Sequence, residues 1–416
     1  MRKLTVKNFS VIKEADLDLR GISVIVGPQA SGKSLICKLG YFFLDIISLS
    51  LESISNQTSL AIFKQQVKAG FHSWFPVQSW GNGKLDITFT HGPFSASVLR
   101  TSYGKALGSN IRLTICQDFC AAYTSALDEV KALSARSKPG WEEVRPWRVR
   151  EIARDRMAGF LGKDERYAQA YIPAGRAFFT TYGKAIAAFE SGSLDRVTYR
   201  FGKLADSMFE HRYFTLPRNR PTAQLFEEIQ YRVLKGRLQV KGERPTFEAE
   251  DGRILSLPNL SSGTQEALPL LASLRTSIDA RPGIVTYVEE PEAHLFPSAQ
   301  KEIVGIIALL ANHHLKRSTW VITTHSPYIL ASFNNLVEAG RLAAAKPALR
   351  EKIASFIPRR LWITEGGFKA YTIEDRILKS IVAEDTGLVS SNFLDQVSET
   401  IGAEFDELLR LGYVEP

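Results

Sequence analysis

Short apolar runs and helical periods alternate along this chain, a pattern that predicts an α/β fold. Three runs predict strands: the apolar Ile22 to Val26, the short β-branched apolar run Ile284 to Val288, and the β-rich Thr319 to Thr323. The second is consistent with a buried parallel strand. Residues 1–116 add alternating or clustered runs that predict a strand-rich, mixed-β N-terminal lobe: Leu85 to Thr90, Phe94 to Arg100 and Ile111 to Cys116.

The middle third has helical periods instead. Its expected helices are Phe119 to Ala135, Val149 to Leu161, Phe178 to Glu190, Leu194 to Arg212 and Thr222 to Leu234, with Pro139 and Pro146 as interruptions. Residues 236–257 return to short strands, with Asp251-Gly252 as a hairpin turn. We therefore divide the chain into an N-terminal lobe (1–116), an inserted helical subdomain (117–235) and a C-terminal lobe (236–416). The insertion is too short and too interrupted for a long heptad coiled coil.

A glycine-rich loop follows the first buried strand. Gly27-Pro28-Gln29-Ala30-Ser31-Gly32-Lys33-Ser34 fits the pattern G-x-x-x-x-G-K-[ST] at every fixed position. Because a strand precedes it and a helix is expected from about Lys33, backbone N–H groups would face an anion there. We expect Gly27, Ser31, Gly32, Lys33 and Ser34 to bind ATP, with Lys33 on the β- and γ-phosphates and the Ser34 hydroxyl on Mg²⁺. The alternative is a glycine-rich turn.

Two adjacent carboxylates end the second buried strand. Because neighbouring residues of a strand point to opposite sides, Glu289 and Glu290 cannot share one role. We expect Glu289 to face the Mg²⁺ shell, and Glu290 to orient or deprotonate the water that attacks the γ-phosphate. The alternative for Glu-Glu-Pro is an acidic turn that caps the next helix. Thr324-His325 ends the third run, where a neutral imidazole can face the γ-phosphate or that water. A lone histidine is more often structural, but its position after a strand favours catalysis.

A fourth motif lies between the first and second strands: Leu260-Ser261-Ser262-Gly263-Thr264-Gln265. In their order along the chain, the glycine-rich loop, this motif, the two glutamates and the histidine resemble the Walker A, signature, Walker B and switch-histidine sequences of ABC-type ATPases. Three further stretches are similar to RecF, SMC and OLD-family heads: Leu4-Thr5-Val6-Lys7-Asn8-Phe9, Tyr171-Ile172-Pro173-Ala174-Gly175-Arg176 and Glu290-Pro291-Glu292-Ala293-His294-Leu295-Phe296-Pro297. The resemblance implies an ABC-ATPase head with a P-loop NTPase fold that hydrolyses ATP. It also implies a homodimer or higher homo-oligomer, in which Ser261 and the Gly263 amide contact the γ-phosphate held by a second head.

Two features depart from that family pattern. Thr264 stands where the signature often has glutamine, which leaves the strength of the ATP-sandwiched dimer open. No Q-loop glutamine can be assigned, since Gln65, Gln66, Gln78 and Gln117 are all candidates. Arg176 acts near the ATP site or is a structural arginine.

Composition indicates a cytoplasmic protein. Three cysteines (Cys37, Cys116 and Cys120) form no disulfide framework, and Cys116 with Cys120 lacks the second pair that a zinc site needs. Met1-Arg2-Lys3 leads directly into a strand without a signal peptide. The longest apolar stretch, Leu39 to Ile47, contains Asp45 and is too short to span a bilayer, so we expect no membrane contact.

Positive charge is concentrated in the middle of the chain. Residues 136–244 hold 22 Lys and Arg against 13 Asp and Glu, whereas the rest holds 30 against 31. Such a patch favours DNA, RNA or an acidic protein as partner. The candidate contacts are Arg148, Arg150, Arg154, Arg218 and Arg220. The alternative is a solvated helical surface with i,i+4 ion pairs.

The functional hypotheses follow from the resemblance. We find no paired-carboxylate strand end in residues 336–416, so we expect no second, nuclease centre. Stand-alone heads of this kind are similar to the ATPase subunits of anti-phage defence systems such as PARIS, Septu and retron systems. That likeness implies a separate effector encoded nearby, often a nuclease. The alternative is a RecF-like DNA-binding ATPase in repair. A transporter motor is disfavoured by the OLD-like Walker B stretch and by the insertion.

Overall fold

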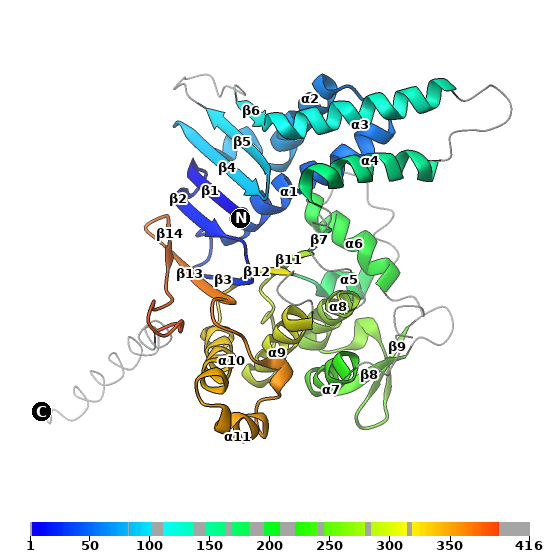
Figure 1. Ribbon diagram of the computed structural model, residues 1–416. Helices are drawn as coiled ribbons and strands as arrows, with labels where there is room; N and C mark the ends of the chain where they lie inside the picture. Colours follow the sequence, from blue (N-terminus) through cyan, green and yellow to red (C-terminus); the bar gives the residue numbers. More distant parts are fainter. Residues whose placement is uncertain are drawn as a thin grey trace, which may run out of the picture.

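The computed structural model describes residues 2–81, 83–100, 111–136, 146–162, 168–182, 195–208, 221–239, 245–278, 284–313 and 318–390. Within these ranges the centre is one mixed sheet (Figure 1) with the order β6-β5-β4-β1-β2-β14-β13-β3-β12-β11-β7. Its strands are β1 (Arg2–Phe9), β2 (Ile12–Asp18), β3 (Ile22–Val26), β4 (Leu85–His91), β5 (Phe94–Arg100), β6 (Arg112–Ile115), β7 (Gln169–Ile172), β11 (Val285–Glu289), β12 (Thr319–Thr324), β13 (Phe368–Glu374) and β14 (Ile377–Ser380). A separate small sheet joins β8 (Gly236–Gln239), β9 (Thr246–Ala249) and β10 (Ile254–Ser256).

Helices cover both faces of the main sheet. One hydrophobic core lies under α1 (Lys33–Ser55), α2 (Leu60–Trp74), α3 (Gln117–Arg136) and α4 (Pro146–Leu161). The other lies under α7 (Pro221–Leu234), α8 (Ser262–Thr276), α9 (Pro297–His313) and α10 (Pro327–Ala345), with α5 (Ala177–Tyr182) and α6 (Arg196–Met208) beside α8 and a short α11 (Arg350–Ala354) after α10. The buried strands alternate between the two cores: Ile25 packs in the first, and Val24 and Val26 pack in the second. In Figure 1, α3 and α4 lie side by side next to α1.

The α/β fold class with a P-loop is confirmed. The strands β3 and β5 match their predicted ranges, and β4, β6, β11 and β12 differ from theirs by one residue at one or both ends. The predicted helices correspond to α3, α4, α5, α6 and α7, although residues 183–190, 194 and 209–212 of these predictions lie outside the described residues. The hairpin turn at Asp251-Gly252 joins β9 to β10.

The described part of the interval 117–235 contains α3 to α7 and one strand, β7. Its strand β7 pairs in parallel with β11, so this interval also supplies an edge of the catalytic sheet. The division of the chain into three domains remains a prediction.

Two strands of the C-terminal lobe were not expected. β13 pairs in parallel with β3, and β14 joins it to β2, so residues 368–380 lie in the middle of the sheet. Glu374 and Asp375 stand where β13 ends, so the sequence-based statement that residues 336–416 contain no paired-carboxylate strand end is wrong. Glu374 pairs with Lys379 at 3.2 Å, and the described residues contain no group of three His, Cys, Asp or Glu side chains able to hold a metal ion.

Helix α1 is the one described helix that is long and apolar enough to cross a membrane by length and composition. In the fold, 67% of its most apolar window is buried. Phe43, Leu39 and Ile46 on this helix are inaccessible to solvent. The apolar character of α1 is therefore accounted for by its position against the sheet.

Candidate functional site

Three parallel strands bring the predicted catalytic segments to one edge of the sheet. In the register, Glu289 of β11 lies beside Thr323 of β12, which lies beside Ile25 of β3. The P-loop, Glu290 and His325 each follow one of these strands directly. Because the carboxyl ends of parallel strands share an edge, the P-loop meets Glu290 and His325 there, although both residues lie far from it in the sequence.

The P-loop turns from β3 into α1 through left-handed backbone. Ala30 and Gly32 have φ angles of 58° and 104°. A Cβ on Gly32 would stand 2.5 Å from Ile12 Cδ1 and 2.8 Å from Val11 Cγ2, so any side chain there would collide with the β1–β2 turn. The Ser31 hydroxyl is buried without a hydrogen-bond partner. A tight loop with an unpaired buried hydroxyl fits a group that brings its own acceptors, as a phosphate does.

Lys33 lies folded against the loop that precedes it. Its Nζ donates to the Gly27 carbonyl (2.8 Å) and to the Pro28 carbonyl (2.7 Å), and only 6% of the residue is exposed. Burial lowers the pKa of Lys33, while the charges of Glu290 and Glu292 oppose that shift. The ammonium group is therefore held at the loop by neutral carbonyls, and anionic oxygens would be stronger acceptors.

The Glu289 carboxylate is buried between β11 and β7. Tyr171 donates its hydroxyl to Oε1 at 2.6 Å, and the Ala174 N–H donates to Oε2 at 3.3 Å. Burial together with the nearby Glu289 charge raises the pKa of Tyr171. Both carboxylate oxygens keep lone pairs beyond these two bonds. The Ser34 hydroxyl is exposed at the start of α1, and carboxylate and hydroxyl oxygens are the kind of ligand that Mg²⁺ prefers.

Glu290 projects from strained backbone toward the histidine. Its φ is 42°, its N–H donates to the Thr323 carbonyl at 2.9 Å, and its side chain is 40% exposed. The Oε1 of Glu290 lies 3.4 Å from Nε2 of His325. Left-handed backbone at a non-glycine residue costs energy and is concentrated at functional sites. The pair of side chains is accessible from solvent, as an attacking water requires.

Glu292 is a site residue that the sequence reasoning did not single out. Its Oε1 accepts a hydrogen bond from the His325 N–H and another from the Thr324 hydroxyl, both at 2.7 Å. Its Oε2 is buried without a partner. Burial raises the pKa of this carboxyl against the hydrogen bonds, which lower it. The sequence signal for Glu292 was that it is the third carboxylate in Glu289-Glu290-Pro291-Glu292. In the structure, Glu292 holds the Thr324-His325 segment beside β11.

The signature residues lie at the start of α8. Ser261 is the N-cap of this helix, and its hydroxyl lies 2.9 Å from that of Thr264. A Cβ on Gly263 would stand 2.7 Å from the His294 carbonyl, so the signature packs closely on the loop after β11. Among the described residues, no hydrogen bond or ion pair joins Ser261 or Gly263 to Gly27–Ser34. Ser261 is exposed.

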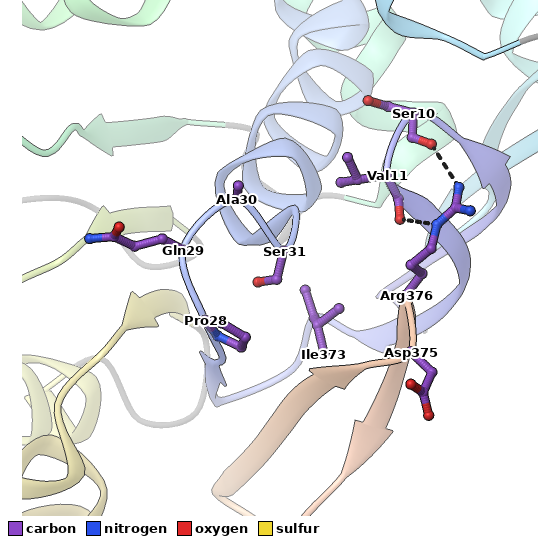
Figure 2. Close-up of a pocket in the computed structure, with 9 residues that line it drawn as sticks. All are labelled: Ser10, Val11, Pro28, Gln29, Ala30, Ser31, Ile373, Asp375 and Arg376. Carbon is purple, nitrogen blue, oxygen red and sulfur yellow. Dashed lines mark hydrogen bonds between the residues drawn. The ribbon is translucent and has the colours of Figure 1, made fainter. Parts of the chain in front are cut away.

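A cavity of about 440 Å³ adjoins the P-loop, within the usual size range of ligand pockets. It is lined from the β1–β2 turn, the P-loop and the β13–β14 turn by Ser10, Val11, Pro28, Gln29, Ala30, Ser31, Ile373, Asp375 and Arg376. Figure 2 shows Arg376 reaching the β1–β2 turn, where it donates to the carbonyls of Val11 (2.9 Å) and Ser10 (3.2 Å). Gln29 points away from the other lining side chains in this view. The cavity is next to the phosphate loop and large enough for the nucleoside end of a nucleotide.

The remaining predicted residues lie elsewhere. Arg148, Arg150 and Arg154 are exposed on α4, and Arg218 and Arg220 lie outside the described residues. Gln65 and Gln66 lie on α2, Gln78 on a short 3-10 helix (Val77–Ser79) and Gln117 at the start of α3. None of these glutamines follows a strand that pairs with β11. The strand β7, which does pair with β11, is followed by Arg176, and the Arg176 guanidinium is fully buried at the catalytic edge.

Comparisons with known proteins agree with this geometry at the level of the domain. A family model described as "AAA domain, putative AbiEii toxin, Type IV TA system" matches residues 170–331. No curated protein matches the sequence. The matched residues contain the signature, β11 with its two glutamates, and the His325 segment, so the chain is similar to an AAA domain over this range.

Solved structures similar to the chain include several SMC heads. One is an SMC head bound to the C-winged helix domain of ScpA (13% identity, TM-score 0.42, 91% of this chain and 96% of that chain). Another is the SMC head domain from Thermotoga maritima (10%, 0.39, 92% and 98%). A third is the Smc head with an extended coiled coil bound to the C-terminal domain of ScpA derived from Pyrococcus furiosus (12%, 0.42, 96% and 98%). Identities and TM-scores this low support no functional argument.

Proposed function

We propose that this protein hydrolyses ATP and works as a nucleotide-gated switch, in a homodimer or higher homo-oligomer with composite ATP sites. The observation that carries the proposal is the meeting of the P-loop, Glu290 and His325 at the ends of β3, β11 and β12. Lys33 and the P-loop amides bind the phosphates, and Glu290 orients or deprotonates the attacking water with His325 beside it. Mg²⁺, held by Ser34 and Glu289, supplies positive charge to the phosphate oxygens when it is bound.

The exposed signature supports the use of a second subunit. Ser261 and Gly263 belong to α8 and have no contact with the P-loop of their own chain among the described residues, so they are available to another chain's γ-phosphate. Three of the large exposed apolar side chains also border the ATP-site motifs: Val11 beside the P-loop, Phe296 after β11 and Tyr328 after His325. Covering such side chains with a second subunit would bury apolar surface.

The test is complementation between two inactive chains. Lys33→Ala removes the phosphate-binding lysine, and Ser261→Arg places a bulky cation where a partner's ATP would bind. Ser261 is preferable to Gly263 because a side chain at Gly263 would also strike its own His294 carbonyl. Neither homodimer should hydrolyse ATP above background, whereas mixed dimers should hydrolyse it measurably through their one complete site. Mixed dimers that form but hydrolyse ATP no faster than either homodimer would contradict the composite site.

We further propose that this ATPase is a cytoplasmic sensor subunit of an anti-phage defence system and controls a separate effector, such as a nuclease. The family model's description, with its AbiEii toxin and Type IV TA system, supports this class over DNA repair. Control requires that the effector bind the open and closed states with different affinities.

Purification from the native host tests the proposed effector. The tagged chain should retain one stoichiometric partner, and Glu290→Gln, which prolongs the ATP-bound state, should change how much is retained. If no partner is retained in either state and the protein instead binds DNA ends in an ATP-dependent way, the defence assignment is wrong.

A further inference from the structure

Arg176 is a fully buried cation at the meeting point of three elements. Its guanidinium donates to the carbonyl oxygens of Glu289 (2.7 Å) and Glu290 (2.9 Å) at the end of β11. It also donates to the Pro173 carbonyl after β7 (2.9 Å) and to the Glu266 carbonyl on α8 (3.2 Å). Four of the five N–H donors of an arginine are thereby used on backbone acceptors. The side chain has no access to solvent.

The counter-ion of Arg176 comes from the signature helix. Glu266 is 3% exposed, and its carboxylate lies 3.5 Å from Nε of Arg176. The same carboxylate accepts the backbone N–H of Arg176 (2.8 Å) and of Ala177 (3.0 Å). Glu266 is the fifth residue of α8, one turn after Ser261 and Gly263. The signature end of α8 is therefore tied through one ion pair to the backbone of the two catalytic glutamates.

We propose that Arg176 is a positioning residue that couples the two ATP sites of a dimer, an inference that rests on the composite sites proposed above. In each subunit, α8 acts on the partner's ATP, whereas Glu289 and Glu290 act on the subunit's own ATP. Arg176 joins these two groups within one chain. ATP bound on a subunit's own P-loop thus sets the position of the signature that the subunit offers to its partner.

The physical reason is the cost of moving a buried, fully bonded ion. A shift of α8 relative to β11 would leave Arg176 or Glu266 without partners in the interior, which is strongly unfavourable. The carbonyl of Glu290 belongs to a residue with strained left-handed backbone, and the Arg176 hydrogen bond holds it there. The helix and the strand end therefore move together or not at all.

The experiment compares dimers that have one disabled site in two backgrounds. A dimer of one intact and one Lys33→Ala subunit, isolated with two different tags, retains one complete site. With Arg176 present, the Lys33→Ala subunit binds no ATP and should misplace its signature. Without coupling, the dimer would hydrolyse ATP at half of the wild-type homodimer rate; with coupling, its rate should be at least about fivefold lower than that half. With Arg176→Lys in both subunits, the same dimer should reach about half of the Arg176→Lys homodimer rate, because a single ammonium cannot hold all four acceptors. Each rate is compared with its own homodimer, so a general loss of activity cancels.

Two further variants keep the test decisive. Glu266→Gln preserves the shape of the side chain but removes the ion pair, and it should give the same one-half ratio if Arg176→Lys fails to fold. Arg275→Lys is the matched control, because Arg275 is also a buried arginine of α8 but pairs with Glu227 on α7, at 2.9 Å. It should keep the wild-type ratio. The quantity compared is the rate of the dimer with one Lys33→Ala subunit divided by the rate of the homodimer in the same background. The coupling alone is overturned if this ratio is one half with Arg176 and Glu266 present. It is also overturned if the ratio stays low in both Arg176→Lys and Glu266→Gln. A wild-type protein that neither dimerises with ATP nor hydrolyses it overturns the proposed function as well.

Discussion

The catalytic edge of the sheet and the outer face of α4 differ in how their charged residues are held. At the edge, Arg176 and Glu266 are almost completely buried, and each of their polar groups has named partners at hydrogen-bond distance. On α4, Arg150 and Arg154 are exposed, and Arg148 has one ion pair, with Glu151 at 3.8 Å. An exposed pair at that distance contributes little to stability. The comparison teaches that motifs with a chemical reason for their spacing led to side chains held by named partners, whereas charge density led to exposed arginines whose binding role stays a prediction.

The largest expected effect is at the catalytic edge. Glu290→Gln should keep ATP binding but slow turnover by a factor of roughly 10²–10⁴, because the general base is lost. Lys33→Ala should lose ATP binding itself. Affinity and turnover should be measured for both variants. Glu338→Gln is the control, since Glu338 pairs with Arg341 on the surface of α10, at 2.7 Å. Near-normal turnover in the Glu290→Gln variant would remove Glu290 from the role of base.

A smaller effect is expected on the exposed face of α4, where it would show whether this face binds nucleic acid. If it binds nucleic acid, replacing Arg148, Arg150 and Arg154 by glutamine should flatten the salt dependence of binding by up to about three units, because fewer counterions are released. Binding to DNA and RNA should be measured over a range of salt concentrations. The matched control removes three exposed, paired arginines elsewhere: Arg253, Arg341 and Arg359. An equal change in the control, or no detectable binding at low salt, would make this face an ordinary solvated surface or a site for an acidic protein.

The smallest effect concerns the pH dependence of stability. Burial raises the pKa of Glu292 above that of the unfolded chain, so the folded state binds the proton more tightly. The resulting stabilisation is fully present below the unfolded pKa and is lost as pH rises through the folded pKa. Glu292→Gln removes this titration while it keeps an acceptor for Thr324 and His325. From about pH 4 to pH 8, the Tm of wild type should therefore fall relative to the variant, by about 1–3 °C.

Thermal unfolding of both proteins over this pH range measures the effect. Glu338→Gln should leave the wild-type pH profile unchanged. A difference between wild type and Glu292→Gln that stays constant with pH would show that Glu292 does not titrate differently on folding.

The sequence was most informative where burial dictates composition. The three runs that became β3, β11 and β12 are buried on both faces, so almost every position had to be apolar or β-branched. The P-loop and the two glutamates could be assigned because phosphate and metal chemistry restrict both residue type and spacing. These assignments describe positions in the fold, and their roles in binding and hydrolysis await the experiments above.

Other features depended on contacts that no local pattern encodes. The β13–β14 hairpin was missed because its turn residues, Asp375 and Arg376, adopt φ angles of 50° and 67° without a glycine. β7 has four residues and owes its place to pairing with β11. The buried bonds of Arg176 and Glu292 join segments far apart in the chain, so neither residue could be given a partner from the sequence.

The position of β13 in the sheet has a consequence for synthesis of the protein. The P-loop strand β3 is completed by residue 26, yet both of its neighbours, β12 and β13, come from residues 319–374. On the ribosome, β3 therefore has no partner strand until most of the chain has emerged. Pairing over such sequence separations is slow, because loop closure costs entropy before any contact forms. A chain that stops short of β13 carries the glycine-rich loop but lacks one of the two strands that flank β3.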